Sequence, residues 1–185
     1  MGGDLSTERL LSAYRAGIFP WPVQGIEPLL WWSPDPRCLL LPGELQVSRR
    51  LERRIRSGRF EVRFDEAAEE IIAACADRPD GTWITPAMAE AYGRLFREGH
   101  VRCAGSWRGG RLVGGIYGVA LGGIFFGESM FFRESDASKV ALVALARSRG
   151  FRFIDCQQET SHLRSLGARA VRRTEFLQRL REALP

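Results

Sequence analysis

The chain has 185 residues, of which 45% are hydrophobic and 26% are charged. This composition is that of a globular protein and excludes disordered and collagen-like chains. No apolar run approaches the roughly 18 residues that a membrane span needs, and the N-terminus MGGDLSTERL lacks the basic-then-apolar layout of a signal peptide. We therefore expect a cytoplasmic protein with one core, or one core plus a small annex.

The charge is positive and is carried almost entirely by arginine. The formal net charge is +5, and Lys139 is the only lysine. Because arginine forms bidentate contacts with phosphate, the arginine content makes RNA the foremost candidate partner. The alternative explanation of the arginine content is a bias in genome composition. The 4 cysteines form no Cys-x-x-Cys pair and the histidines number only 2, which argues against a disulfide framework and against a metal site.

The chain divides near residue 36. Ser6 can cap a short N-terminal helix. Residues 17–36 are dense in proline and tryptophan, which excludes a long helix or a central strand and predicts an ordered loop region. We expect residues 1–36 to form a small annex and residues 37–185 to form the main domain.

The main domain begins with helices and then changes to strands. The first expected elements are a basic helix over 48–57, a strand over 60–64, a helix capped by Asp65 and ending at Ala76, and a helix that Thr85 caps and Gly99 stops. Three β-prone runs follow, separated by short turns, over 100–107, 112–121 and 124–132. They predict an antiparallel meander.

The last third predicts a helix that returns the chain to this sheet. The expected elements are a helix over 136–148, a strand over 151–155 beside the meander, a short helix ending near Gly167, a strand over 170–172 and a terminal helix that Thr174 can cap. This order is that of the GNAT-type acyltransferase fold, an α+β fold in which the acyl donor sits where two neighbouring strands splay apart. The segment over 132–139 contains no glycine, which argues against coenzyme A because its pyrophosphate needs close backbone N–H groups.

Short motifs along most of the chain resemble one enzyme family. They are, in order, GGDLS, YRAGIFPW, WWSPDPR, GTWIT, GGIYG, FFGESMF, ASKVAL, IDCQ, HLRSLGA and the pair Arg173 and Phe176. The sequence is thereby similar to the leucyl/phenylalanyl-tRNA–protein transferases, bacterial enzymes that mark proteins for degradation. The resemblance implies transfer of leucine or phenylalanine, and possibly methionine, from aminoacyl-tRNA to the α-amine of proteins that begin with arginine or lysine. It implies neither a cofactor nor a metal.

The resemblance also implies a catalytic group. Asp155 and Gln157 match the pair proposed in the family, in which the carboxylate acts through the amide to draw a proton from the amine. The amide could instead orient the amine or stabilise the oxyanion, with the 2′-hydroxyl of the tRNA moving the proton. Glu128 would hydrogen-bond Gln157 or hold the α-amine of the aminoacyl group.

The remaining implied contacts bind the donor. An apolar aminoacyl pocket is expected from Ile116, Met130, Leu142, Leu145 and Ile154. The indole rings of Trp21 and Trp83 would hold the terminal adenosine of the tRNA. The basic helix would contact the tRNA body through Arg49, Arg50, Arg53, Arg54 and Arg56, against which only Glu52 and Glu61 lie close enough in sequence to offset charge.

Three other readings remain open at this point. A related transferase with a different acceptor preference would carry the same motifs. A small-molecule N-acyltransferase would bind acetyl-coenzyme A, and a tRNA-binding module without catalysis would be insensitive to loss of Asp155. We expect a monomer in each case.

Overall fold

The structure is a computed structural model that describes residues 2–23, 25–79, 81–148 and 150–184. The helices are α1 (Thr7–Arg15), the 3₁₀ turn η1 (Pro42–Glu44), α2 (Arg49–Arg56), α3 (Ala68–Ala76), α4 (Pro86–Arg97), α5 (Ala137–Ser148), α6 (Ser161–Arg164) and α7 (Arg173–Ala183). The strands are β1 (Phe19–Trp21), β2 (Leu30–Trp32), β3 (Arg37–Leu40), β4 (Glu61–Phe64), β5 (Val101–Arg108), β6 (Arg111–Leu121), β7 (Ile124–Phe132), β8 (Phe153–Gln157) and β9 (Arg169–Val171). Together they form a mixed α+β fold.

The main sheet has the strand order β4-β5-β6-β7-β8-β3-β9. The meander β5-β6-β7 is antiparallel and β8 returns parallel to β7, as the sequence predicts. The parallel pairing covers only Ile124–Phe126 of β7 against Phe153–Asp155 of β8, although β7 runs on to Phe132. The sheet therefore opens between these two strands beyond residue 126.

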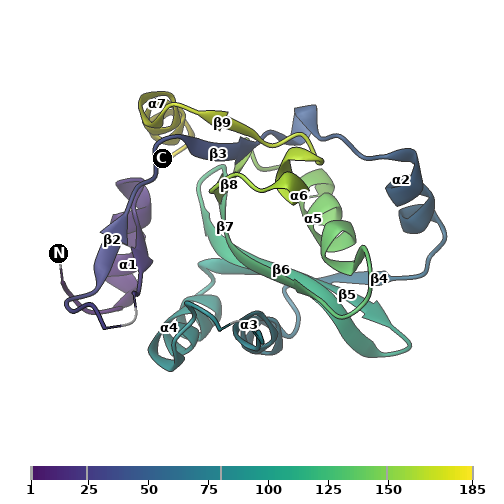
Figure 1. Ribbon diagram of the computed structural model, residues 1–185, viewed down its shortest axis with the longest axis horizontal. Helices are drawn as coiled ribbons and strands as arrows, with labels where there is room; N and C mark the ends of the chain where they lie inside the picture. The colour runs from purple at the N-terminus through teal and green to yellow at the C-terminus, as the bar shows by residue number, and fades with distance from the viewer. Residues whose placement is uncertain (1, 24, 80, 149, 185) are drawn as a thin grey trace.

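Helices cover both faces of the sheet (Figure 1). One apolar cluster includes buried residues of α3 and α4, such as Ile71 and Leu95. A second cluster includes buried residues of α5, such as Leu142 and Leu145. Among the described residues no helix is long and apolar enough to cross a membrane.

The N-terminal segment shares the core of the sheet. Residues 17–36 contain the two-stranded antiparallel ribbon β1-β2 rather than a loop alone. Leu10, Tyr14 and Phe19 are buried in the same cluster as α4, and the ring of Tyr14 lies 5.1 Å from that of Phe126. Directly after this segment the chain enters β3, an unpredicted strand that lies between β8 and β9. The N-terminal residues therefore lie close to the place where the sheet opens.

Helix bounds are mostly as predicted, but three of the expected caps are wrong. Ser6 stands at the N-cap position of α1, but its side chain makes no capping hydrogen bond, and its hydroxyl donates to Asp4 instead. Ala67 rather than Asp65 stands at the N-cap of α3, and the carboxylate of Asp65 accepts from the backbone N–H of Cys103 on β5. Thr174 lies inside the first turn of α7, since that helix begins one residue earlier.

The expected cap of α4 is confirmed, because Thr85 accepts from the backbone N–H of Met88. Ser48 caps α2 without having been predicted, and it accepts from the backbone N–H of Leu51. Each side chain satisfies one of the amide groups that the first turn of a helix leaves without an intrahelical acceptor.

Candidate active site

A cavity of about 120 Å³ lies where β7 and β8 separate. Four residues of the expected aminoacyl pocket line it, namely Ile116, Met130, Leu142 and Ile154. Leu145 is fully buried in the same apolar cluster but does not line the cavity. An apolar cavity of about 150 Å³ accepts a molecule of the size of benzene, so this space suits a single apolar side chain.

Glu128 lines the cavity because β7 contains a bulge. Tyr117 pairs with Ser129 and Gly118 pairs with Gly127, which leaves Glu128 as the extra residue on β7. A bulge of this kind redirects a side chain from the regular alternation of the strand. The carboxyl group accepts from Gln157 Nε2 at 3.0 Å and from the hydroxyl of Tyr92 at 2.9 Å. The hydrogen bond expected between Glu128 and Gln157 is therefore present.

Burial raises the pKa of Glu128 to about 7, and the nearby charge of Asp155 also raises it. The tyrosine hydroxyls oppose this shift because they donate to the ionised form. The hydroxyl of Tyr92 is itself 2.7 Å from that of Tyr14 on α1. A carboxyl group with a pKa near neutrality can exchange a proton at physiological pH.

Gln157 ends β8 in an unusual backbone conformation. Its φ is +61°, in the left-handed region that residues other than glycine seldom occupy. The side chain lines the cavity and is almost fully buried. Such strain is maintained only where surrounding contacts fix the residue, and here a hydrogen bond to Asp155 holds the backbone while the bond to Glu128 holds the side chain.

Asp155 is paired with a fully buried arginine. Nε and Nη2 of Arg37 donate to the two carboxylate oxygens at 2.8 and 2.6 Å. The guanidinium lies between the rings of Phe19 and Phe176, whose centroids are 4.9 and 4.4 Å from Cζ. Asp155 Oδ1 also accepts from the backbone N–H of Gln157 at 2.9 Å. The hydrogen bond to Gln157 is thus made to its backbone rather than to its side-chain amide.

Sequence reasoning missed Arg37 as a site residue. The signal was present in the segment RCLL, where one charged residue begins a run that is otherwise apolar and entirely buried. A buried arginine requires an anionic partner. The partner could not be identified from sequence because 118 residues separate it from Arg37.

Trp21 and Trp83 come together from distant parts of the chain. Their rings are stacked with centroids 5.7 Å apart and planes inclined by 22°. This is the distance of two aromatic rings in direct contact. A nucleobase held here would therefore stack on an outer face of the pair rather than between the two rings.

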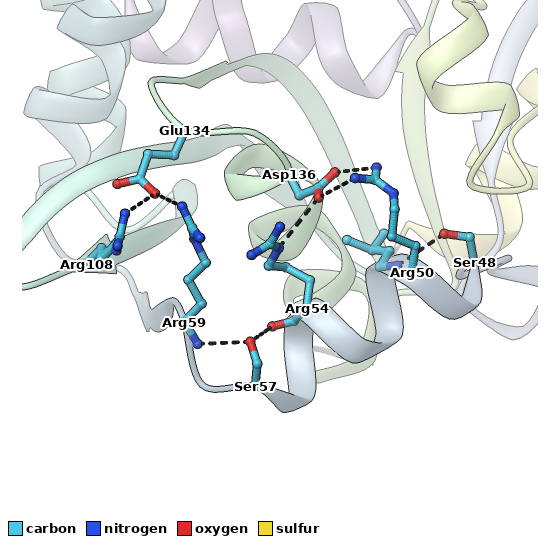
Figure 2. Close-up of polar contacts among 9 residues, drawn as sticks. Ser48, Arg50, Arg54, Ser57, Arg59, Arg108, Glu134 and Asp136 are labelled. Carbon is cyan, nitrogen blue, oxygen red and sulfur yellow. Dashed lines mark hydrogen bonds and ion pairs between the residues drawn. The ribbon is translucent and has the colours of Figure 1, made fainter.

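The basic helix α2 carries more ion pairs than its sequence suggests. Arg50 makes a bidentate contact with Asp136, and Arg54 lies 3.8 Å from the same carboxylate (Figure 2). Arg56 pairs with Glu52 on its own helix. The expectation that only Glu52 and Glu61 offset this charge is wrong, because the loop before α5 brings Asp136 to the helix. Within the described part of the chain, Arg49 and Arg53 have no ion-pair partner.

A second acidic residue of the same loop also binds arginine. Glu134 Oε2 accepts from Arg59 and Arg108, each at 2.9 Å (Figure 2). The loop that precedes α5 therefore presents carboxylates rather than a glycine-rich turn of free N–H groups. Across the described residues no group of three or more His, Cys, Asp or Glu side chains could hold a metal ion.

Comparisons with known proteins identify the family. The model of the leucyl/phenylalanyl-tRNA protein transferase matches residues 39–181, and the model of the N-terminal domain of that transferase matches residues 3–35. A leucyl/phenylalanyl-tRNA–protein transferase of Solidesulfovibrio magneticus is 56% identical over 99% of this chain and 76% of its own length. One of Thiobacillus denitrificans is 56% identical over 98% of this chain and 82% of its own.

The chain therefore belongs to the leucyl/phenylalanyl-tRNA protein transferase family, whose members are aminoacyltransferases. Among solved structures, it is similar to a conserved protein of unknown function from Bacteroides thetaiotaomicron. That likeness has a TM-score of 0.50 at 13% identity and covers 70% of this chain and 53% of the other. It concerns the fold alone.

Proposed function

We propose that the protein transfers leucine or phenylalanine, and possibly methionine, from aminoacyl-tRNA to the α-amine of proteins that begin with arginine or lysine. The transfer would mark these proteins for N-degron proteolysis. The observation that carries the proposal is the apolar cavity at the opening between β7 and β8, with Glu128 and Gln157 in its wall, in a chain of this family. An apolar cavity fits the side chain of leucine or phenylalanine, and the two polar groups fit aminolysis of its ester.

The reaction requires a proton acceptor close to the attacking amine. The amine nitrogen forms a bond to the ester carbonyl carbon, the bond from that carbon to the ribose oxygen breaks, and the amine loses a proton. We assign the proton to Glu128, which lines the cavity and whose pKa burial raises to about 7, and from there it passes to the departing ribose oxygen, so that the tRNA leaves with a free hydroxyl. Gln157 would orient the amine or donate to the oxyanion, since its Nε2 already donates to Glu128.

Asp155 would act by positioning Gln157. Both of its oxygens accept from Arg37, and Oδ1 also holds the backbone N–H of Gln157. This supports a refinement of the family's proposed pair, in which the carboxylate fixes the strained backbone of Gln157 rather than relaying a proton through the amide. Asp155 then serves the reaction through another residue.

The donor would be held by three surfaces. Ile116, Met130, Leu142 and Ile154 would contact the amino-acid side chain, with Leu145 supporting them from the core. The outer face of the Trp21 and Trp83 pair would stack on the terminal adenine. Helix α2 would contact phosphates of the tRNA body, and Arg49 and Arg53 are the arginines whose charge the described carboxylates leave unpaired.

The wider features of the protein follow from this proposal. We assign the fold to the GNAT type, supported by the order of meander, helix and parallel strand and by the opening between β7 and β8. We assign residues 1–36 to a small annex and residues 37–185 to the catalytic domain. A monomer acting in the cytoplasm is proposed, since aminoacyl-tRNA is made there.

The test is a transfer assay with radiolabelled leucyl-tRNA and peptides that begin with arginine, lysine, glutamate or alanine. We expect label to enter only the arginine and lysine peptides. Label in the glutamate peptide would be compatible with the proposed donor site but would overturn the proposed preference for arginine and lysine acceptors. Absence of transfer to every peptide would contradict the proposed function.

A further inference from the structure

A groove of about 480 Å³ lies beside the candidate active site, between the end of α3 and the last residues of β7. Asp77, Arg78 and Pro79 line one side, and residues 130–133 line the other. Because β8 pairs with β7 only as far as Phe126, this end of β7 lies beyond the part of the strand that β8 covers. No step of the reaction proposed above uses this groove.

The groove adjoins the aminoacyl cavity. Met130 lines the groove and the aminoacyl cavity alike. Arg78 Nη2 donates to Ser129 Oγ at 2.9 Å and to the carbonyl oxygen of Met130 at 3.1 Å, and Ser129 also lines the cavity. The loop that contains Arg78 continues to Trp83 before α4 begins. A chain leaving the cavity thus has the groove as its neighbour.

The charge of the groove suits an anion. Arg78 and Arg133 are exposed, and they donate hydrogen bonds to carbonyl and hydroxyl oxygens. Neither has an ion-pair partner among the residues that the structure describes, whereas Arg50, Arg59 and Arg108 all bind carboxylates. Asp77 offsets one of the two charges. An acceptor peptide that begins with arginine or lysine would be repelled here.

The groove also has an aromatic wall exposed to solvent. Phe132 is 67% exposed, whereas Ile26 and Trp32, the other exposed large hydrophobic residues in the described part of the chain, are 47% and 44% exposed. An exposed ring beside guanidinium groups is the arrangement by which proteins bind single-stranded nucleic acid, with the ring stacking on a base and the cations contacting phosphates.

We propose that this groove binds the single-stranded nucleotides that precede the terminal adenosine of the donor tRNA. Phe132 stacks on one of their bases, and Arg133 and Arg78 contact the phosphates. This inference rests on the proposed function, because the strand reaches the groove only when its aminoacyl end occupies the cavity.

The test compares donors of increasing length, namely leucine esterified to adenosine, to the dinucleotide CA, to the trinucleotide CCA and to full tRNA. For Phe132→Ala we expect the KM for the trinucleotide donor to rise about tenfold, the range of one lost base stack. The KM for leucyl-adenosine should change less than twofold, which also shows that the variant folds. Phe132→Trp should keep the wild-type values, and so should Trp32→Ala, a control that removes another exposed ring.

Arg133→Ala provides an independent measurement. The slope of log KM for leucyl-tRNA against log salt concentration should fall by about one, as expected for one lost phosphate contact. The proposal is overturned if Phe132→Ala affects all donors equally or none of them. It is also overturned if the KM for the acceptor peptide rises with every donor, because the groove would then bind protein. Failure of the wild type to transfer from leucyl-tRNA would instead contradict the proposed function.

Discussion

Two buried carboxyl groups lie on neighbouring strands of the site, in opposite electrostatic settings. Asp155 on β8 is fully buried against the guanidinium of Arg37 and accepts hydrogen bonds at both oxygens. Glu128 on β7 has no ion-pair partner among the described residues and accepts from uncharged donors that include the amide of Gln157 and the hydroxyl of Tyr92. Asp155 thus lies against a positive charge, whereas burial of Glu128 favours its neutral form and raises its pKa to about 7.

The difference assigns a structural role to Asp155 and a chemical role to Glu128. The oxygens of Asp155 are occupied by a buried guanidinium and by the backbone N–H of Gln157, which suits a residue that holds its neighbours in place. A carboxyl group that titrates near neutrality gains and loses a proton at small cost. We therefore expect damage to Asp155 or Arg37 to appear mainly in stability, and damage to Glu128 to appear mainly in the pH dependence of the rate.

The largest effect is expected from Arg37→Met. It leaves the buried charge of Asp155 without a partner, a change that costs about 3–5 kcal/mol in other proteins. Urea unfolding at pH 7.5 measures the free energy of unfolding. The double variant Arg37→Met with Asp155→Leu is the matched control and should recover much of the loss, since it leaves no unpaired charge. A wild-type free energy of unfolding in Arg37→Met would contradict the structural role of the pair.

Glu128→Gln tests the other carboxyl group. We expect kcat/KM to fall about 10²-fold, as for removal of a general base. The wild-type rate should rise with pH through about 7, where Glu128 ionises, and the variant should lack this inflection. A variant that keeps the inflection would assign it to another group.

The same variant has a stability signature of known sign. The pKa of Glu128 is about 7 in the folded protein against 4.5 for an ordinary glutamate. The folded state therefore favours the protonated form, and the wild type loses stability as pH rises through about 7. The free energy of unfolding of the wild type should therefore fall between pH 5 and pH 8.5 by more than that of Glu128→Gln. Urea unfolding of both proteins at both pH values measures this difference.

Gln157 connects the two settings, and two substitutions separate its side chain from its backbone. Gln157→Ala and Gln157→Gly both remove the amide, and each should lower kcat about tenfold with little change in KM. Only glycine adopts the positive φ at this position without strain. The free energy of unfolding of Gln157→Gly should therefore exceed that of Gln157→Ala by about 1 kcal/mol. Equal stability of the two variants would show that the backbone is not strained.

The sequence was sufficient for elements whose signals are local. The meander, the return of β8 and the helices α2, α4 and α5 follow from periodicity, glycine turns and caps such as Thr85. Strand β3 was missed because it has only the short run RCLL and gains its partners, β8 and β9, from far along the chain. Motif resemblance supplied the candidate site residues, and the structure adds the hydrogen bond between Glu128 and Gln157.

What sequence could not supply were the pairings of charges. Arg37 on β3 pairs with Asp155 on the neighbouring strand β8. Asp136 pairs with two arginines of α2 only because the loop before α5 folds against that helix. Counting charges near a helix in sequence therefore overestimates the positive charge that it presents. Long-range ion pairs depend on the tertiary fold, which no local pattern of residue types encodes.

Asp136 gives the mildest test of the same contrast, because its arginine partners reach the surface. The side chain of Asp136 is 3% exposed, but that of Arg50 is 62% exposed, so solvent screens the pair far more than it screens Arg37 and Asp155. Asp136→Asn keeps one oxygen as an acceptor for Arg50 and Arg54 while removing the charge that offsets them. If α2 contacts tRNA phosphates, the KM for leucyl-tRNA should fall about threefold at low salt, with a steeper salt dependence. The KM for leucyl-adenosine should stay unchanged, since that donor has no tRNA body. A rise in the KM for leucyl-tRNA would mean that Asp136 orients the arginines for binding and does not merely neutralise them.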